Sequence, residues 1–262
     1  MSMVKQPTFF ISHGSPMMAV ENSATSHFIK DLANTIEKPK AIIVFSAHFD
    51  LRKGIVITSG SAPKTIHDFY GFPQELYDME YSAPGDPELA QRIAQKFEAH
   101  GLKPMMSDEQ GWDHGVWIPL SLMYPNADIP VVQISINSLL GAEVNYRYGE
   151  MLADFRDENI LIIGSGGVSH NLREVFNPVP DKNRVGKVEE FTGWIKEKLE
   201  QNDQSSLFNY MEQAPHVLFN HPSQEHFLPL MAAWGASNAT PGKRIHKDSE
   251  YEILALDAYR FN

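Results

Sequence analysis

The sequence of 262 residues predicts a single α/β domain in which helices flank a largely parallel or mixed central sheet. Short, β-branched apolar runs bounded by turn-forming residues are typical of buried strands, and they occur at residues 8–12, 41–47, 54–59, 130–136 and 159–163. Helical patterns alternate with these runs, at residues 86–101, 141–157, 186–201 and 226–236. Such an alternation places ligand-binding residues at the carboxyl ends of the strands.

The clearest helical pattern runs from Asp86 to Gly101. Asp86 is a favourable N-cap residue and is followed by a proline, apolar residues recur at helical spacing through Phe97, and the glycine ends the pattern. Near the other end of the chain, residues 251–261 alternate enough to predict a further strand. We see no repeat, low-complexity segment or linker, so we expect one domain over residues 1–262.

Composition excludes several classes of function. A hydrophobic content of 42% with 21% charged residues is typical of a globular protein with an ample core. The net charge of −11 argues against a nucleic-acid partner, which requires clustered lysine and arginine. The absence of cysteine excludes disulfides, thiolate nucleophiles and cysteine-ligated metals. No apolar run is long enough to span a membrane and no signal peptide is apparent, so we expect a cytoplasmic protein.

Three predicted strands lead directly into a histidine. His13 follows the strand at 8–12, His48 ends the stretch FSAH, and His170 follows the run at 159–163 through Gly164, Gly166 and Gly167. We expect these glycines to let the backbone turn sharply and approach a ligand, so that His170 faces the site. One histidine at a strand end is commonly structural, but three predict a metal or catalytic site at one edge of the sheet.

Other catalytic motifs fail on inspection. A hydrolase nucleophile elbow, G-x-S-x-G, would need glycine where Ile163 stands, and a dinucleotide fingerprint would need glycine at Ser169. The segment also lacks the lysine of a phosphate-binding loop, and the chain has no H-E-x-x-H zinc-protease motif.

Two further segments place histidines in unusual surroundings. His114 stands between Trp112 and Trp117, which suits either a pocket for a planar substrate or a buried aromatic cluster. The segment NHPSQEHFLPL contains His221 and His226, whose five-residue spacing does not put both on one face of a helix. We therefore expect only one of these two histidines to point at the site.

Six motifs then occur in order along the chain: HGSP at 13–16, SAH at 46–48, TIHDFYGFP at 65–73, DHGVW at 113–117, SGGVSHNL at 165–172 and PSQEHFLPL at 222–230. In this order and spacing they resemble the DOPA-dioxygenase branch of the extradiol aromatic ring-cleaving dioxygenases, the LigB-like group. The resemblance extends from residue 8 to about residue 230.

The resemblance implies a non-haem metal, usually Fe(II), at the strand ends. It places His13, His48 and His226 on the metal, while Glu225 leaves open a version of the site in which a carboxylate is the third ligand. His170 falls on the acid/base histidine of the family, and in a zinc-loaded form it is a candidate fourth ligand.

The resemblance also suggests a substrate pocket. His114 falls on a catalytic histidine that lines it, and we expect Trp117 to lie there. His67 either lines the pocket or caps its own loop. Candidates for orienting the metal ligands are Ser46, Asp113 and Asn171.

The implied reaction is opening of a catechol ring by dioxygen outside the two hydroxyl groups, with 3,4-dihydroxyphenylalanine and 4,5-cleavage as the suggested case. Three ligands leave coordination positions open for a catechol and dioxygen, and histidine can take and return a proton near neutral pH. A zinc-dependent hydrolase using the same cluster, and a non-catalytic metal-binding protein, are the alternatives. The sequence leaves the metal, the particular catechol and the oligomeric state open.

Overall fold

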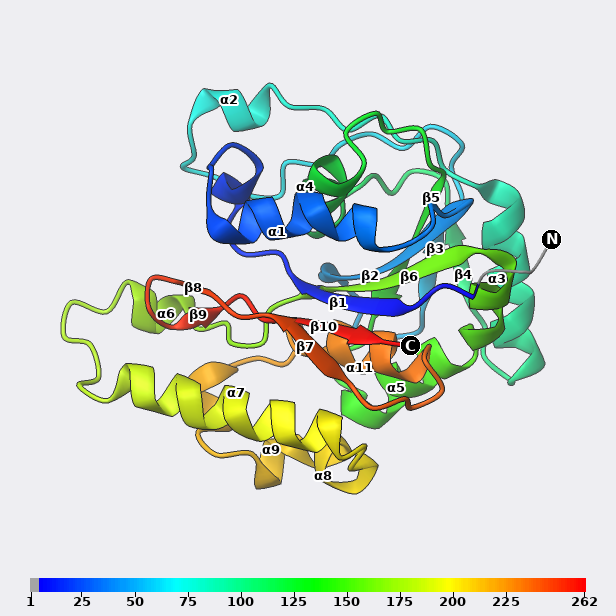
Figure 1. Ribbon diagram of the computed structural model, residues 1–262. Coiled ribbons are helices and arrows are strands. Elements are labelled where there is room, and N and C mark those ends of the chain that lie inside the picture. The colour runs from blue at the N-terminus through cyan, green and yellow to red at the C-terminus, as the bar shows by residue number, and fades with distance from the viewer. Residues whose placement is uncertain (1–4) are drawn as a thin grey trace.

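A computed structural model describes residues 5–262, and its centre is one mixed sheet of eight strands (Figure 1). The strand order across the sheet is β4-β3-β5-β2-β6-β1-β10-β7. Their bounds are β1 Thr8–Ser12, β2 Ala41–Asp50, β3 Val56–Thr58, β4 Met105–Ser107, β5 Val131–Ile136, β6 Ile160–Gly166, β7 Lys243–His246 and β10 Ala258–Phe261. A second sheet pairs β8, Ser249–Glu250, with β9, Leu254–Ala255.

Four central strands, β5, β2, β6 and β1, run parallel. β3 is antiparallel to β5 but parallel to β4, and β10 is antiparallel to both β1 and β7. In β2, Ile42 and Val44 pack on one face of the sheet, and Ile43 and Phe45 pack on the other. Burial on both faces explains why these strands read as continuous apolar runs. The predicted class, an α/β domain with a mixed sheet, is confirmed.

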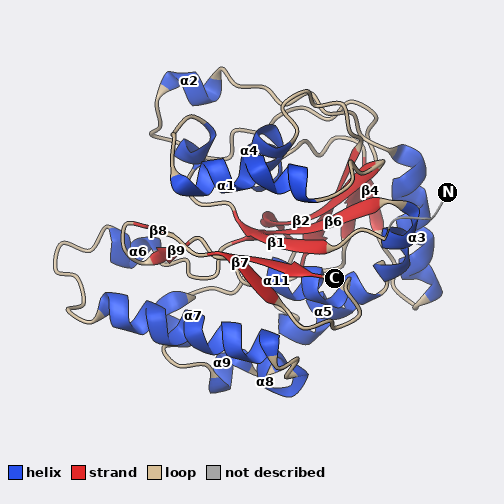
Figure 2. Cartoon of the chain, in the orientation of Figure 1, coloured by secondary structure: helices blue, strands red, loops and turns tan. Residues whose placement is uncertain are grey.

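Helices cover both faces of the sheet (Figure 2). In Figure 1, α1 and α4 lie above the sheet, α5 and α11 lie below it, and α7, α8 and α9 form an outer layer beneath. The helices are α1 Ala24–Leu32, α2 Gln74–Tyr77, α3 Pro87–Ala99, α4 His114–Met123, α5 Gly141–Glu150, α6 Leu172–Val175, α7 Arg184–Glu200, α8 Gln204–Phe208, α9 Tyr210–Gln213, α10 Val217–Asn220 and α11 Leu228–Gly235. Three 3₁₀ turns are η1 Pro16–Ala19, η2 Ala33–Thr35 and η3 Ala153–Glu158. From residue 5 to residue 262, no helix is long and apolar enough to cross a bilayer.

Two predicted elements are not continuous over their predicted length. The helix predicted at 141–157 stops at Glu150, and a 3₁₀ turn follows that Asn159 closes in the left-handed conformation with φ 63°. The strand predicted at 251–261 is wrong as one element, because β9 and β10 belong to different sheets. Tyr251 and Glu252 adopt positive φ values of 50° and 66°, which end any extended run there.

Helix α4 escaped prediction because every side of it is apolar. Nine of its ten residues are buried, so no amphipathic period marks it, and Pro119 lies inside it. This helix matters for function because His114 is its first residue.

Two glycines of β6 allow a close backbone contact with the segment that precedes and begins α11. A Cβ atom on Gly164 would lie 2.0 Å from the carbonyl oxygen of Pro229, and one on Gly166 would lie 2.1 Å from that of His226. Neither glycine has positive φ, so the sharp turn expected at these positions is wrong. The glycines instead let His226 approach the end of β6, where the amide of Gly167 donates to the His226 carbonyl at 2.8 Å.

Replacement of Gly164 by alanine should test this packing. Gly164→Ala puts a methyl group against backbone that cannot rotate away, so the free energy of unfolding should fall by about 1–3 kcal/mol. Gly193→Ala is the matched control: this position in α7 has nothing within 4 Å, and alanine should raise stability by about 0.5–1 kcal/mol. Urea unfolding measures both, and a Gly164→Ala protein as stable as its parent would show that the close contact is not needed.

Candidate active site

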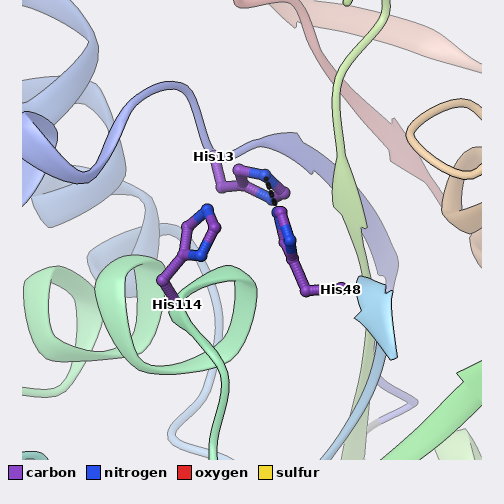
Figure 3. A group of neighbouring side chains, drawn as sticks. All are labelled: His13, His48 and His114. Carbon is purple, nitrogen blue, oxygen red and sulfur yellow. Dashed lines mark hydrogen bonds between the residues drawn. The ribbon is translucent and has the colours of Figure 1, made fainter. Parts of the chain in front are cut away.

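Five histidines from separate parts of the chain lie together at the carboxyl ends of the central strands. His13 follows β1, His48 lies near the end of β2, and His114 begins α4. His170 follows β6, and His226 precedes α11. Figure 3 shows the first three converging, with the rings of His13 and His48 in contact. The predicted convergence at the strand ends is therefore seen in the fold.

His13, His48 and His226 surround one point. The Nε2 atoms of His13 and His48 are 3.1 Å apart, and their ring centres are 4.9 Å apart. The ring centre of His226 lies 5.5 Å from that of His13 and 5.0 Å from that of His48. The side chains of His13 and His226 are almost completely buried.

The other two histidines lie against members of this group. His170 lies parallel to His226, with ring centres 3.4 Å apart and planes inclined by 8°. His114 lies 3.8 Å from His48 and 5.3 Å from His13, measured between ring centres. The amide of His170 is held by the carbonyl of Asn220 at 2.9 Å, so the loop carrying His170 is fastened to the end of α10.

The tautomer of His13 is set by a serine. The hydroxyl of Ser165 donates its single proton to the carbonyl of Gly115, so it can only accept from Nδ1 of His13, 3.0 Å away. His13 therefore carries its proton on Nδ1 and presents the Nε2 lone pair to the centre of the cluster. Gly115 allows this approach, because a Cβ atom there would lie 2.6 Å from Ser46 Oγ and 3.3 Å from His13 Nδ1.

Carboxylates take the same position at His48 and His226. Nδ1 of His48 lies 3.4 Å from Oδ2 of Asp68, and Nδ1 of His226 lies 3.1 Å from Oε1 of Glu225. Both histidines are thus set to carry the proton on Nδ1 and to leave Nε2 free, as metal-binding histidines do. Nε2 of His226 is buried and has no hydrogen-bond partner among residues 5–262. A buried nitrogen without a partner is costly unless it binds something, so the residues fit a metal ion.

The cluster favours neutral imidazoles. Burial, and then repulsion from neighbouring histidines, holds the pKa of His13 and of His226 well below the usual value, and burial dominates for His48 as well. Burial, aided by His114, lowers the pKa of His170 to about 4. Neutral imidazole is the form that binds a metal and the form that accepts a proton.

His67 and Trp117 lie beside the cluster rather than inside it. Trp117 is fully buried, and its indole N–H donates to the carbonyl of Ile66 at 3.1 Å. His67 packs against Trp117 with ring centres 5.8 Å apart, and its Nε2 meets the carbonyl of Met79 at 3.0 Å. His67 also lines a surface cavity of about 700 Å³ that none of the five clustered histidines lines. In the structure both residues support the loop over the site.

His221 does not join the cluster. Its Nε2 donates to the carbonyl of Val168 at 2.7 Å, and its ring packs against Phe191 and Phe227 beneath the loop that carries His170. Of the pair His221 and His226, only His226 faces the other histidines, as the five-residue spacing predicts.

The groups that orient the three central imidazoles were missed in the sequence. The Ser46 hydroxyl donates to Asp113 at 2.7 Å and accepts from the backbone amide of His48 at 3.2 Å, and Asn171 caps α6. These bonds reach no ring nitrogen of His13, His48 or His226. Burial raises the pKa of Asp113 to about 6 despite its bonds to Ser46 and Gln133. The residues that do orient the imidazoles are Ser165, Asp68 and Glu225. The first two stand inside the motifs SGGVSHNL and TIHDFYGFP, which was the available signal.

Comparison with known proteins identifies the family of this chain. A family described as the catalytic LigB subunit of aromatic ring-opening dioxygenase matches residues 7–261. The chain belongs to this family. LigB-family enzymes are oxidoreductases that depend on a metal, and the histidine cluster offers the donors for one. The resemblance seen in the motifs is confirmed.

Relatives of this LigB-family chain carry a common name. A "4,5-DOPA dioxygenase extradiol" of Beta vulgaris is 40% identical over 259 residues, covering 97% of this chain and 96% of the relative. Another of that name, from Escherichia coli K12, is 41% identical over 241 residues, covering 90% and 87%. The crystal structure of an uncharacterised protein from Escherichia coli K12 has a TM-score of 0.80 at 31% identity, covering 98% of this chain and 100% of that one.

Proposed function

We propose that this LigB-family chain opens the ring of a catechol by extradiol cleavage with dioxygen, and that 3,4-dihydroxyphenylalanine, cleaved at the 4,5-bond, is a candidate substrate. The names of the relatives from beet and Escherichia coli support the substrate class. The observation that carries the proposal is the group of three imidazoles whose Nδ1 atoms all face oxygen atoms, which directs all three Nε2 atoms inward.

The separations of the rings support His13, His48 and His226 as the metal ligands. With a metal–nitrogen bond near 2.0–2.1 Å, a ring centre lies about 3.2 Å from the metal, so two ligands about 90–110° apart have ring centres about 4.5–5.3 Å apart. The three observed separations are 4.9, 5.0 and 5.5 Å.

Proximity alone would also suggest His114 as a ligand, because ligand atoms of His13, His48 and His114 lie within 4.8 Å of one another. The ring centres of His114 and His48 are only 3.8 Å apart, which is too close for two ligands of one ion. The 3.4 Å stacking of His170 on His226 gives the same result for His170. These two histidines are left free to act on the substrate.

Glu225 supports His226 instead of replacing it. Its carboxylate oxygen meets Nδ1 of His226, on the side of the ring opposite the free Nε2. A carboxylate in this position raises the basicity of the imidazole and fixes its orientation. We therefore propose three histidine ligands in place of two histidines and a carboxylate.

We propose Fe(II) as the working metal. When bound, it would lower the pKa of a phenolic hydroxyl of the catechol and provide a binding position for dioxygen beside it. His170 accepts the second phenolic proton, because it is neutral at pH 7 and lies against His226. The same imidazole would then be able to return the proton to the ring-opened product. His114, held on α4 beside His48, is placed to form a hydrogen bond with the substrate.

A zinc hydrolase or an inert metal-binding protein is less well supported. Either could use the three imidazoles, but an inert site needs no acid/base residue beside it, and the structure has His170 and His114 there. Family membership also favours ring-opening chemistry.

The function is tested by loading the purified chain with Fe(II) without oxygen and then adding air and a panel of catechols. We expect oxygen uptake with a yellow ring-opened semialdehyde, and no uptake from the same protein loaded with Zn²⁺. Hydrolysis of ester or amide substrates by the zinc form, without oxygen uptake by the iron form, would support the hydrolase instead.

The third ligand is tested by two single substitutions. His226→Ala should abolish metal retention after gel filtration, because it removes a donor. Glu225→Ala should keep the metal with affinity reduced by roughly 10–100-fold, the usual effect of losing an orienting carboxylate. Metal content and affinity are measured on both proteins, and the reverse pattern would restore the carboxylate as third ligand.

His170→Gln should separate proton transfer from metal binding. This variant should hold Fe(II) and bind catechol, yet turn over roughly 10²–10⁴-fold more slowly, because glutamine cannot exchange the proton. The limb of the pH–rate profile that reports this imidazole should shift or vanish. If the variant loses its metal as fully as His13→Ala, then His170 is a ligand in the working enzyme.

A further inference from the structure

Asp68 is the one carboxylate that contacts two histidines of the cluster in the described structure. Its Oδ2 lies 3.0 Å from Nδ1 of His114 and 3.4 Å from Nδ1 of His48. The contact with His114 is close but not aligned as a full hydrogen bond. Its Oδ1 accepts the backbone N–H of His114 at 2.9 Å. Both oxygens of this carboxylate are therefore used inside the site.

The bond to the backbone of His114 makes Asp68 the cap of α4. Asp113 occupies the N-cap position, but its side chain makes no capping bond and faces Ser46 and Gln133 instead. The first amide of the helix is satisfied from outside by Asp68. The same side chain thus positions both the backbone and the ring of His114.

The loop that carries Asp68 is fixed to the start of α4. Ile66 donates its amide to Trp112 at 2.8 Å, and Trp112 donates its own to Lys64 at 2.8 Å. A Cβ atom at Gly111 would lie 2.1 Å from the Lys64 carbonyl oxygen, so the two strands of chain touch through backbone. Asp68 is therefore held in place before any ligand binds.

We propose that Asp68 is a positioning residue shared by both halves of the site. Its one carboxylate fixes the tautomer of the metal ligand His48 and the orientation of the substrate-side His114, and it ties both to the loop at 64–68. The roles of His48 and His114 in this inference rest on the proposed function. A shared carboxylate means that metal affinity and catechol affinity depend on the same side chain.

Asp68→Asn separates this role from helix capping. Asparagine caps a helix as well as aspartate, but it has no charge, and its amide group cannot accept a proton from both imidazoles. Asp78→Asn is the matched control, since Asp78 is exposed on the same segment and accepts a hydrogen bond from Gln74. Asp68→Ala removes the cap as well as the charge.

Metal binding is measured with Co²⁺, whose visible spectrum reports the ligand geometry without turnover. We expect Asp68→Asn to weaken Co²⁺ binding by roughly 10–100-fold and to change the spectrum, while the Asp78→Asn protein matches its parent. Catechol binding is measured on protein saturated with Zn²⁺, where Asp68→Asn should weaken it by roughly 5–10-fold. The melting temperature of the metal-free protein should fall in Asp68→Ala and stay near the parent value in Asp68→Asn.

Three results would overturn the inference. Unchanged Co²⁺ and catechol affinities in Asp68→Asn would leave Asp68 as a helix cap only. Loss of Co²⁺ affinity with unchanged catechol affinity would assign Asp68 to His48 alone. A parent protein that binds no Co²⁺ would refute the proposed metal site itself, which the other two results do not.

Discussion

Several imidazoles crowd together at the strand ends, and burial and repulsion between neighbouring rings keep His13, His48, His170 and His226 from taking up an extra proton. Burial is the largest cause of the low pKa of His13, His48 and His226, and the neighbouring rings add to it. A neutral imidazole has one N–H group and one nitrogen with a free lone pair, so its hydrogen-bond partners determine which nitrogen carries the proton. Every other feature of the site follows from how that choice is made.

Oxygen atoms that face Nδ1 determine the tautomer of the three central rings. Ser165, Asp68 and Glu225 stand at the three Nδ1 positions, and they come from β6, a loop and the turn before α11. Two carboxylates and one hydroxyl make the three rings unequal. Asp68 carries a full charge, because its contacts with His114 and His48 outweigh its partial burial and lower its pKa to about 2. In the proposed site the carboxylate charges of Asp68 and Glu225 therefore lie behind the imidazoles.

The strands, and the positions of histidines at strand ends, could be predicted because both are visible as local sequence patterns. Parallel strands buried on both faces read as apolar runs, and a histidine at the end of such a run is visible by position alone. The orienting groups left weaker marks. Asp68 and Ser165 stand inside two of the motifs, but nothing in the motifs tells that Asp68 faces His48, or that Ser165 bonds a ring 152 residues away. Such contacts are formed by tertiary packing. The requirement for glycine at Gly164 has the same origin, because its partner Pro229 belongs to a distant segment.

The five histidines of the cluster stand at positions 13, 48, 114, 170 and 226. No two of them are closer than 35 residues in the sequence. The arrangement of the three proposed ligands, His13, His48 and His226, therefore forms only in the folded chain. An ion that binds only the complete fold draws the folding equilibrium toward it, by an amount that grows with the ion's concentration relative to its dissociation constant. A metal held as proposed by His13, His48 and His226 would therefore also stabilise the fold, and the resistance of the protein to unfolding would rise with metal supply.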